Sequence, residues 1–320
     1  MSPDQAQTVI EVRPCTVAAH QGRAAYGRRV SSPDPSPADL EPYDAPDARR
    51  RLVVEVWIVL GLSLARSGVY SVIVLVDRLT ASTALGDQTA TLNPSRSDRP
   101  WLDVLYQLYS LTFPLVPVAL ALYLLAPTMR RAARRMGLDW SRPWRDLGVG
   151  VALAAAIGIP GLGLYALGRA LGITVQVQPA GLDATWWTVP VLLASAVQAG
   201  LLEEVVAVGY LSERLRDLRW SVPAVVAASA LLRGSYHLYQ GFGPFLGNVV
   251  MGVVFALWYQ GVSRAAPWAG RATARGAARD TPWHTRRVMP LVMAHAVMDA
   301  VVFVGYPLMP DGWLQALHLV

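Results

Sequence analysis

Carboxylate, imidazole and guanidinium side chains lie inside three apolar stretches in the C-terminal half of the sequence. An ionisable side chain within a membrane-spanning helix is a functional candidate, because lipid does not solvate it and it must find a partner. The candidates are Glu203 and Glu204 in the first stretch, Arg233 and His237 in the second, and His295 and Asp299 in the third.

The spacing of the second and third pairs places each pair on one side of a helix. Arg233 and His237 are four residues apart, and so are His295 and Asp299. Residues at this spacing are neighbours on a helix surface. If the three helices face one another, the candidate side chains converge on one region.

Glu203 and Glu204 are adjacent, so their side chains leave a helix about 100° apart. One can therefore enter a site while the other braces it from the side. A carboxylate near two imidazoles can take a proton from water and pass it to a leaving amine. The same groups can instead hold a divalent metal through imidazole nitrogen and carboxylate oxygen. The alternative is a buried polar network that only ties helices together.

The elements that must position these residues are apolar runs without the period-two alternation of strands. A helix needs about 20 apolar residues to cross the hydrocarbon core, and in lipid continuous runs indicate helices. The sequence therefore predicts an all-α fold, a polytopic transmembrane helical bundle of about seven to eight helices. The runs are Leu52–Val76, Leu102–Leu125, Leu147–Leu167, Val189–Leu211, Val222–Tyr239, Phe245–Val262 and Val288–Tyr306. The fifth run is short, which predicts a kinked or partly inserted helix.

Three other ionisable residues in the runs, Glu55, Arg66 and Asp103, are interpreted as structural.

Composition supports this fold class. The sequence is 53% hydrophobic and only 16% charged, and its mean hydropathy is +0.34, which excludes a single long soluble enzyme. The single cysteine, Cys15, forms no internal disulfide. The net charge is +6, yet the basic residues, all arginine, form short clusters beside apolar runs rather than one stripe. We therefore expect no nucleic-acid partner.

The arginine clusters predict the orientation in the membrane, because basic residues accumulate in cytoplasmic loops. Counting from a cytoplasmic N-terminus, the cytoplasmic loops hold fifteen arginines and the opposite loops four. We expect a multi-pass protein of the cell membrane with its N-terminus in the cytoplasm. The predicted organisation is a disordered cytoplasmic tail (1–50), N-terminal transmembrane helices (51–182), a catalytic transmembrane core (183–310) and a C-terminal tail (311–320).

The three polar stretches, taken in order, resemble the CPBP family of intramembrane metalloproteases, which is related to CAAX prenyl proteases and to bacteriocin-processing or immunity proteins. The family pattern is Glu-Glu-x-x-x-Arg, then Phe-x-x-x-His, then His-x-x-x-Asn. The resemblance covers about residues 185–308, and the matching segments read Glu203-Glu204-Val-Val-Ala-Val208, Arg233-Gly-Ser-Tyr-His237 and His295-Ala-Val-Met-Asp299.

The resemblance implies an intramembrane endopeptidase that acts on membrane-associated or lipidated protein or peptide substrates. Glu203 would activate the hydrolytic water with help from Glu204. His237 and His295 would bind a divalent metal, zinc by family analogy, or stabilise the oxyanion, and Asp299 would stand in for the family asparagine. A glutamate-activated water without a metal is the other mechanism that the resemblance allows.

Three positions depart from the family pattern: Val208 replaces its arginine, Arg233 its phenylalanine and Asp299 its asparagine. Loss of a buried arginine would leave Glu204 without a counter-charge. We infer that the charge has moved, and that Arg233 contacts Glu204 or Asp299 directly. The alternatives are an inactive membrane scaffold or immunity protein of the same family and, in a third class, an ion-coupled transporter.

Overall fold

The computed structural model describes residues 46–182, 185–261 and 286–305, together with residue 312. The predicted N-terminal tail up to residue 45, Cys15, most of the loop before Arg286 and nearly all of the C-terminal tail lie outside the described residues. All described residues belong to one compact unit.

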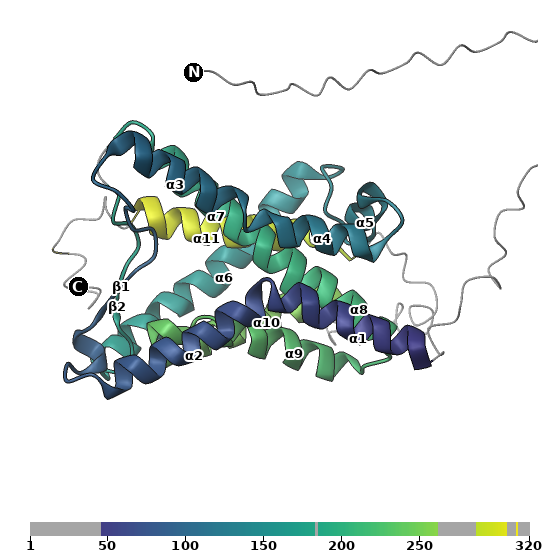
Figure 1. Cartoon of the computed structure of the whole chain (residues 1–320), viewed down its shortest axis with the longest axis horizontal. Helices are drawn as coiled ribbons and strands as arrows, with labels where there is room; N and C mark the ends of the chain where they lie inside the picture. The colour runs from purple at the N-terminus through teal and green to yellow at the C-terminus, as the bar shows by residue number, and fades with distance from the viewer. Residues whose placement is uncertain (1–45, 183–184, 262–285, 306–311, 313–320) are drawn as a thin grey trace, which may run out of the picture. The chain divides into compact units, whose positions relative to one another are not determined.

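The described chain is almost entirely helical (Figure 1). The first half contains α1 (Pro46–Gly61), α2 (Leu64–Thr80), α3 (Pro100–Thr112), α4 (Leu115–Leu125), α5 (Met129–Arg135) and α6 (Pro143–Ala170). The second half contains α7 (Thr188–Glu203), a π-helical segment (Glu204–Tyr210), α8 (Leu211–Asp217), α9 (Val222–Ser235), α10 (Phe242–Gln260), α11 (Met289–Ala300) and a second π-helical segment (Val301–Gly305).

The predicted helical bundle is confirmed, and each of the seven apolar runs is helical over most of its length. Among the described residues, four helices are long and apolar enough to cross a membrane, and five if the bent pair α1–α2, with an angle of 53°, counts as one span. These are the helices of an integral membrane protein. Helix α1 begins at Pro46, so residues 46–50, which the sequence analysis assigned to the tail, are helical.

One small sheet was not predicted. Strand β1 (Thr89–Thr91) pairs in parallel with β2 (Gln176–Gln178) between the ends of α2 and α6. Three-residue strands carry too little alternation to be found in a sequence. Tyr165 on α6 supports the pair, because its hydroxyl accepts a hydrogen bond from the backbone N–H of Val177 at 2.9 Å.

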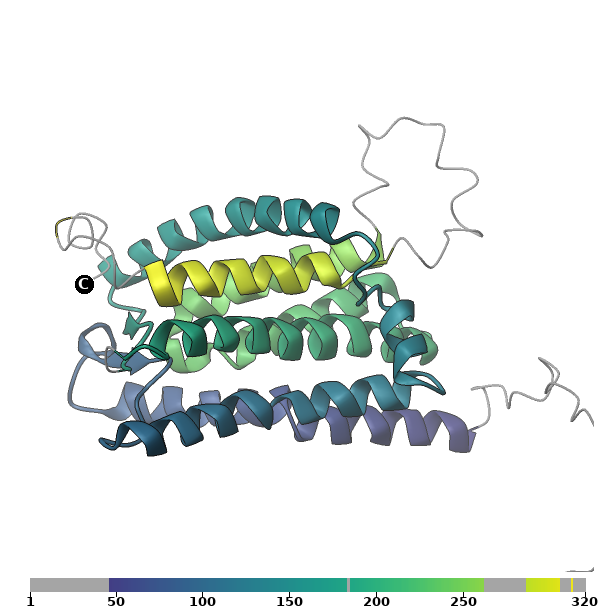
Figure 2. The same cartoon turned by 90° about the horizontal axis from the view of Figure 1, so that it is seen from above.

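The helices that carry the candidate residues lie beside one another. Figure 2 shows α11 between α6 and α7, and α11 packs on both. Helix α9 packs on α10 and touches the π-helical segment that follows α7. The main core runs through this region and includes Val208, Phe255 and Leu291.

An ion-pair cluster fixes the start of α11. Arg287 Nε donates to both carboxylate oxygens of Asp146 at 3.1 Å, and its Nη1 lies 3.2 Å from Asp139 Oδ1. Partial burial works against ionisation of Asp139, but hydrogen bonds from Ser141 and Arg287 outweigh it and lower the pKa of this carboxyl. The α5–α6 connection is thereby tied to the helix that carries His295.

Two residues interpreted as structural prove to be so. Glu55 Oε1 accepts hydrogen bonds from the Tyr210 hydroxyl at 2.8 Å and from Arg214 Nε at 2.7 Å, which joins α1 to α8. Asp103 accepts from the backbone N–H of Arg96 at 2.6 Å and fixes the start of α3.

Candidate active site

The glutamate pair lies where helix α7 changes its winding. Glu203 is the last residue of α7, and Glu204 is the first residue of the π-helical segment, which is buried throughout. π-Helical turns are rare and often occur at functional sites. Ser229 on α9 donates to the backbone carbonyl of Ala207 at 2.7 Å, so α9 satisfies part of the altered backbone.

A glycine lets α11 approach the glutamates. A Cβ atom added at Gly200 would lie 2.9 Å from the backbone oxygen of Val292 and 3.5 Å from His295 Cβ. Only glycine permits this distance between α7 and α11. The resulting contact brings His295 beside the end of α7.

Arg233 pairs with both glutamates, which confirms the expected contact with Glu204. The guanidinium is fully buried, its Nη2 hydrogen-bonds Glu204 Oε1, and its Nη1 lies 3.3 Å from Glu203 Oε2. It also lies 5.4 Å from the ring centre of Phe255, at cation–π distance. Val208, in the family's arginine position, is buried in the apolar core. The cation of this site therefore comes from α9 and not from the helix of the glutamates.

Glu203 has one occupied and one free oxygen. Its Oε2 accepts a hydrogen bond from the Tyr236 hydroxyl at 2.7 Å as well as from Arg233. Within the described residues no group hydrogen-bonds Oε1, and 14% of the side chain is exposed. Glu203 is thus oriented through one oxygen while the other is available to a ligand. Tyr236 was not identified in the sequence analysis. In the sequence, only its position next to His237 in an apolar run could have indicated a role in the site.

His295 lies between two carboxylates. Its Nδ1 is 2.6 Å from Glu204 Oε1 and 4.0 Å from Glu203 Oε2. Its Nε2 is 3.4 Å from Asp299 Oδ2, one turn further along α11. An imidazole donates through both nitrogens only as the imidazolium. This geometry balances part of the carboxylate charge and orients the ring, and it connects Asp299 to the site.

His237 joins the site from a different backbone setting than predicted. Helix α9 ends at Ser235, and the chain turns through a 3-10 segment (Leu238–Gln240) to Gly241, whose φ of 100° suits glycine. His237 Nδ1 still lies 3.0 Å from the carbonyl oxygen of Arg233. A ring that donates there through Nδ1 leaves Nε2 as an acceptor, and Nε2 has no hydrogen bond to any described residue.

The donor set suits a divalent metal in type and spacing. Among the described residues, ligand atoms of Glu203, Glu204 and His295 lie within 4.8 Å of one another, and carboxylate oxygen and imidazole nitrogen are zinc ligands. Glu204 Oε2 is buried without a hydrogen-bond partner in the described chain, as an unfilled ligand would be. His237, named with His295 as a metal ligand from the sequence, is outside this group.

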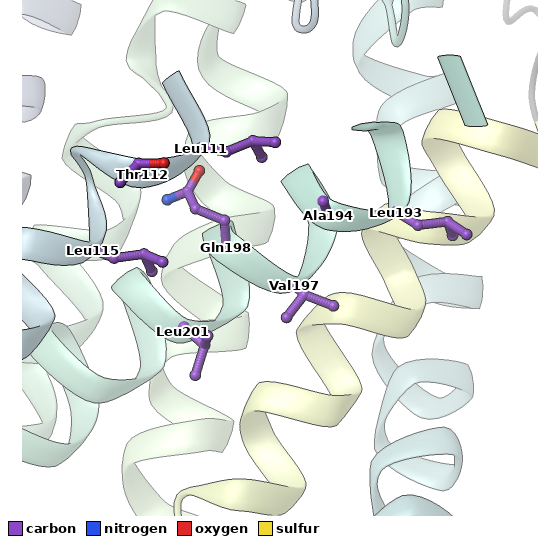
Figure 3. A pocket seen from close by; sticks show the side chains of 8 residues that line it. All are labelled: Leu111, Thr112, Leu115, Leu193, Ala194, Val197, Gln198 and Leu201. Carbon is purple, nitrogen blue, oxygen red and sulfur yellow. The ribbon is translucent and has the colours of Figure 1, made fainter. Parts of the chain in front are cut away.

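A cavity beside α7 is separate from these residues. It has a volume of about 440 Å³ and is lined by Leu111, Thr112, Leu115, Leu193, Ala194, Val197, Gln198 and Leu201. Figure 3 shows these side chains projecting from α3, α4 and α7, with the amide of Gln198 turned towards Thr112. It contains none of the six candidate residues, so we assign it no part in the site.

Gly200→Ala is expected to change the geometry of the site, although Gly200 is not one of the site residues. The new methyl group must push α11 away from α7, which costs about 1–3 kcal/mol for an overpacked contact and lengthens the His295–Glu204 contact. Thermal unfolding in detergent measures this. Gly161→Ala is the control, because a Cβ there meets nothing within 4 Å and alanine favours helix. Equal unfolding temperatures for the two variants would contradict the close approach.

Comparison with known protein families finds a match to part of the chain. Residues 185–269 match the family model described as type II CAAX prenyl endopeptidase Rce1-like. This stretch contains Glu203, Glu204, Arg233 and His237 and ends before His295 and Asp299. No curated protein and no solved structure matches the chain. The segment that carries the first two motifs therefore matches the family model of type II CAAX prenyl endopeptidases, and the resemblance to CAAX proteases is confirmed over these residues.

Proposed function

We propose that the protein is an intramembrane endopeptidase that hydrolyses peptide bonds of membrane-associated or lipidated protein substrates with a water activated by Glu203. The observation that carries the proposal is the asymmetry of the Glu203 carboxylate. Tyr236 and Arg233 hold Oε2, while Oε1 has no hydrogen bond from the described residues. A general base needs this combination of fixed orientation and one free oxygen.

The reaction follows from that oxygen. Glu203 Oε1 takes a proton from water as the water oxygen forms a bond to the carbonyl carbon of the scissile peptide. The C–N bond then breaks as Glu203 returns the proton to the leaving nitrogen. The products are a new carboxylate terminus and a new amine terminus.

Glu204, Arg233 and His295 act as positioning residues in this proposal. Glu204 is fully buried and contacts both Arg233 and His295, so it is poorly placed to meet a substrate. The trio fixes the relative positions of α7, α9 and α11. Asp299 orients the His295 ring by contacting Nε2 of that ring.

His237 is the group that we assign to the substrate. Its Nδ1 is engaged by the carbonyl of Arg233, and its Nε2 has no hydrogen-bond partner in the described chain. We propose that Nε2 contacts the tetrahedral intermediate or the leaving nitrogen. A neutral imidazole that can gain a proton suits either contact.

A divalent metal, zinc by its donor set, would be held by Glu203, Glu204 and His295. When bound, such a metal polarises a carbonyl and lowers the pKa of water. The Arg233 guanidinium already contacts the same two carboxylates. A metal would therefore share or displace the contacts of Arg233, and the proposal of a glutamate base does not depend on it.

Two other functions use the same residues. An inactive scaffold or immunity protein would keep the Arg233–Glu204–His295 network only to tie helices together. An ion-coupled transporter would use the buried carboxylates as a proton relay. Neither role needs the free oxygen of Glu203, which favours the peptidase.

We also propose that the protein lies in the cell membrane with its N-terminus in the cytoplasm, because of the distribution of arginines between the loops. A reporter fused after Arg275 should therefore be found in the cytoplasm.

The test is cleavage by the purified full-length protein in liposomes. A prenylated CAAX peptide, the same peptide without its lipid and a transmembrane peptide are incubated with the wild type and with Glu203→Ala. We expect at least one peptide to be cut by the wild type alone. Elemental analysis of the same samples, before and after a chelator, measures bound metal. A folded wild type that cuts none of the three would favour the inactive scaffold.

A further inference from the structure

The segment from α5 to the start of α6 lies at one end of the bundle. Helix α5 follows α4 and runs across the direction of α4 and α6 in both views (Figures 1 and 2). It connects two membrane-spanning elements, Pro100–Leu125 and Pro143–Ala170. Where both of these elements cross the bilayer, the segment that connects them lies at the membrane–water boundary.

The exposed arginines of this segment have no carboxylate partner among the described residues. The acids of the segment, Asp139 and Asp146, are both taken by Arg287, and Arg135 is paired with Glu213 at 2.7 Å. Within the part of the chain that the structure describes, the remaining positive charge is therefore uncompensated. We define the arginine surface as the exposed residues Arg130, Arg131, Arg134, Arg142 and Arg145.

Two exposed tryptophans lie within the same segment. Trp140 is 72% exposed and Trp144 is 82% exposed, although indole is costly to leave in water. Tryptophan is enriched at the headgroup level of bilayers, where its apolar ring and its N–H both find partners. Arginine and tryptophan together thus favour lipid over a soluble partner.

The segment is also joined to the two helices that carry the site. The backbone N–H of Val288 donates to the carbonyl of Met136 at 2.8 Å, just before α11 begins. Met136 packs in the same core as Val208, four residues after Glu204. Arg135 holds Glu213 on α8. These contacts couple the position of this segment to the helices that carry Glu203 and His295.

We propose that the arginine surface binds the phosphate headgroups of anionic phospholipids, and that this binding stabilises the bundle. Guanidinium groups bind phosphate oxygens through paired N–H donors. A basic residue at an anionic membrane surface contributes about a fivefold gain in binding. The proposal is independent of any peptidase activity.

The experiment uses the full-length protein in a neutral detergent, with phosphatidylglycerol or phosphatidylcholine added. Native mass spectrometry counts retained lipids, and thermal unfolding measures stabilisation. The test variant is Arg130→Gln/Arg131→Gln/Arg134→Gln. The control is Arg96→Gln/Arg99→Gln, which removes two exposed arginines before α3, at the other end of the Pro100–Leu125 span; Arg99 lies over the Trp101 ring there.

We expect the wild type and the control to retain phosphatidylglycerol over phosphatidylcholine and to unfold at a higher temperature with it. The triple variant should lose at least about tenfold in this preference, while its unfolding temperature without lipid stays unchanged, because the replaced side chains are exposed. High salt should weaken the preference of the wild type. Equal retention of the two lipids by the wild type, or an equal loss of the preference in the control, would each overturn the proposal.

Discussion

Glu203→Gln is expected to abolish peptide cleavage while leaving the fold intact. Glutamine keeps an oxygen for the hydrogen bonds from Tyr236 and Arg233, so the side chain remains in place. It cannot accept a proton from water, and loss of a general base lowers the rate about 10²–10⁴-fold. Cleavage in liposomes and thermal unfolding in detergent measure the two effects separately.

Glu204→Gln should behave differently. It removes the negative charge that faces both the buried guanidinium of Arg233 and the imidazole of His295. We expect a loss of about 3 kcal/mol in stability together with the loss of activity. Glu55→Gln is a matched control, because Glu55 also accepts hydrogen bonds from a tyrosine and an arginine but lies outside the site. The Glu55→Gln variant should therefore still cleave the peptide. If Glu203→Gln were cleavage-competent, or if Glu55→Gln were equally inactive, the assignment of the base would be wrong.

Arg233→Leu is expected to have the largest effect on stability. The guanidinium is fully buried between Glu203 and Glu204, and its removal leaves an uncompensated buried carboxylate. Breaking a buried pair in this way costs about 3–5 kcal/mol. We expect a lower unfolding temperature and a loss of any activity.

A double-mutant cycle tests whether the charge has been relocated to α9. Val208→Arg alone places a second cation in the apolar core, and Arg233→Phe alone removes the existing one. The two changes together restore the family arrangement and should recover stability, with a coupling energy of about 1–3 kcal/mol. Additive effects would show that Arg233 does not replace the missing arginine.

The residues of the site were predictable from the sequence because lipid makes an isolated charge costly. Glu203, Glu204, Arg233 and His295 each lie in an apolar run, and the structure brings these four into contact. The expectation that Arg233 contacts Glu204 or Asp299 rested on charge balance and on the missing family arginine at Val208, and the structure shows the contact with Glu204. The helical class followed from the apolar runs.

Other features depend on tertiary contacts that leave no mark in a single sequence. The π-helical winding after Glu203 occurs where the chain packs against α4, α9 and α10, while the sequence of this stretch is that of an ordinary apolar helix. The end of α9 before His237 comes from the turn into Gly241. Tyr236 resembles any aromatic residue of an apolar run until its hydroxyl is found on Glu203.

Hydrolysis by an activated water is tested most directly by mass spectrometry of cleavage products formed in ¹⁸O-labelled water. The full-length protein in liposomes is given the peptide that it cuts, and the Glu203→Gln variant is the control. The account predicts that each new carboxylate terminus carries one ¹⁸O atom from solvent, and that the variant forms no product. Products that form equally with the variant, or no product from a folded wild type with any membrane-associated peptide, would contradict it.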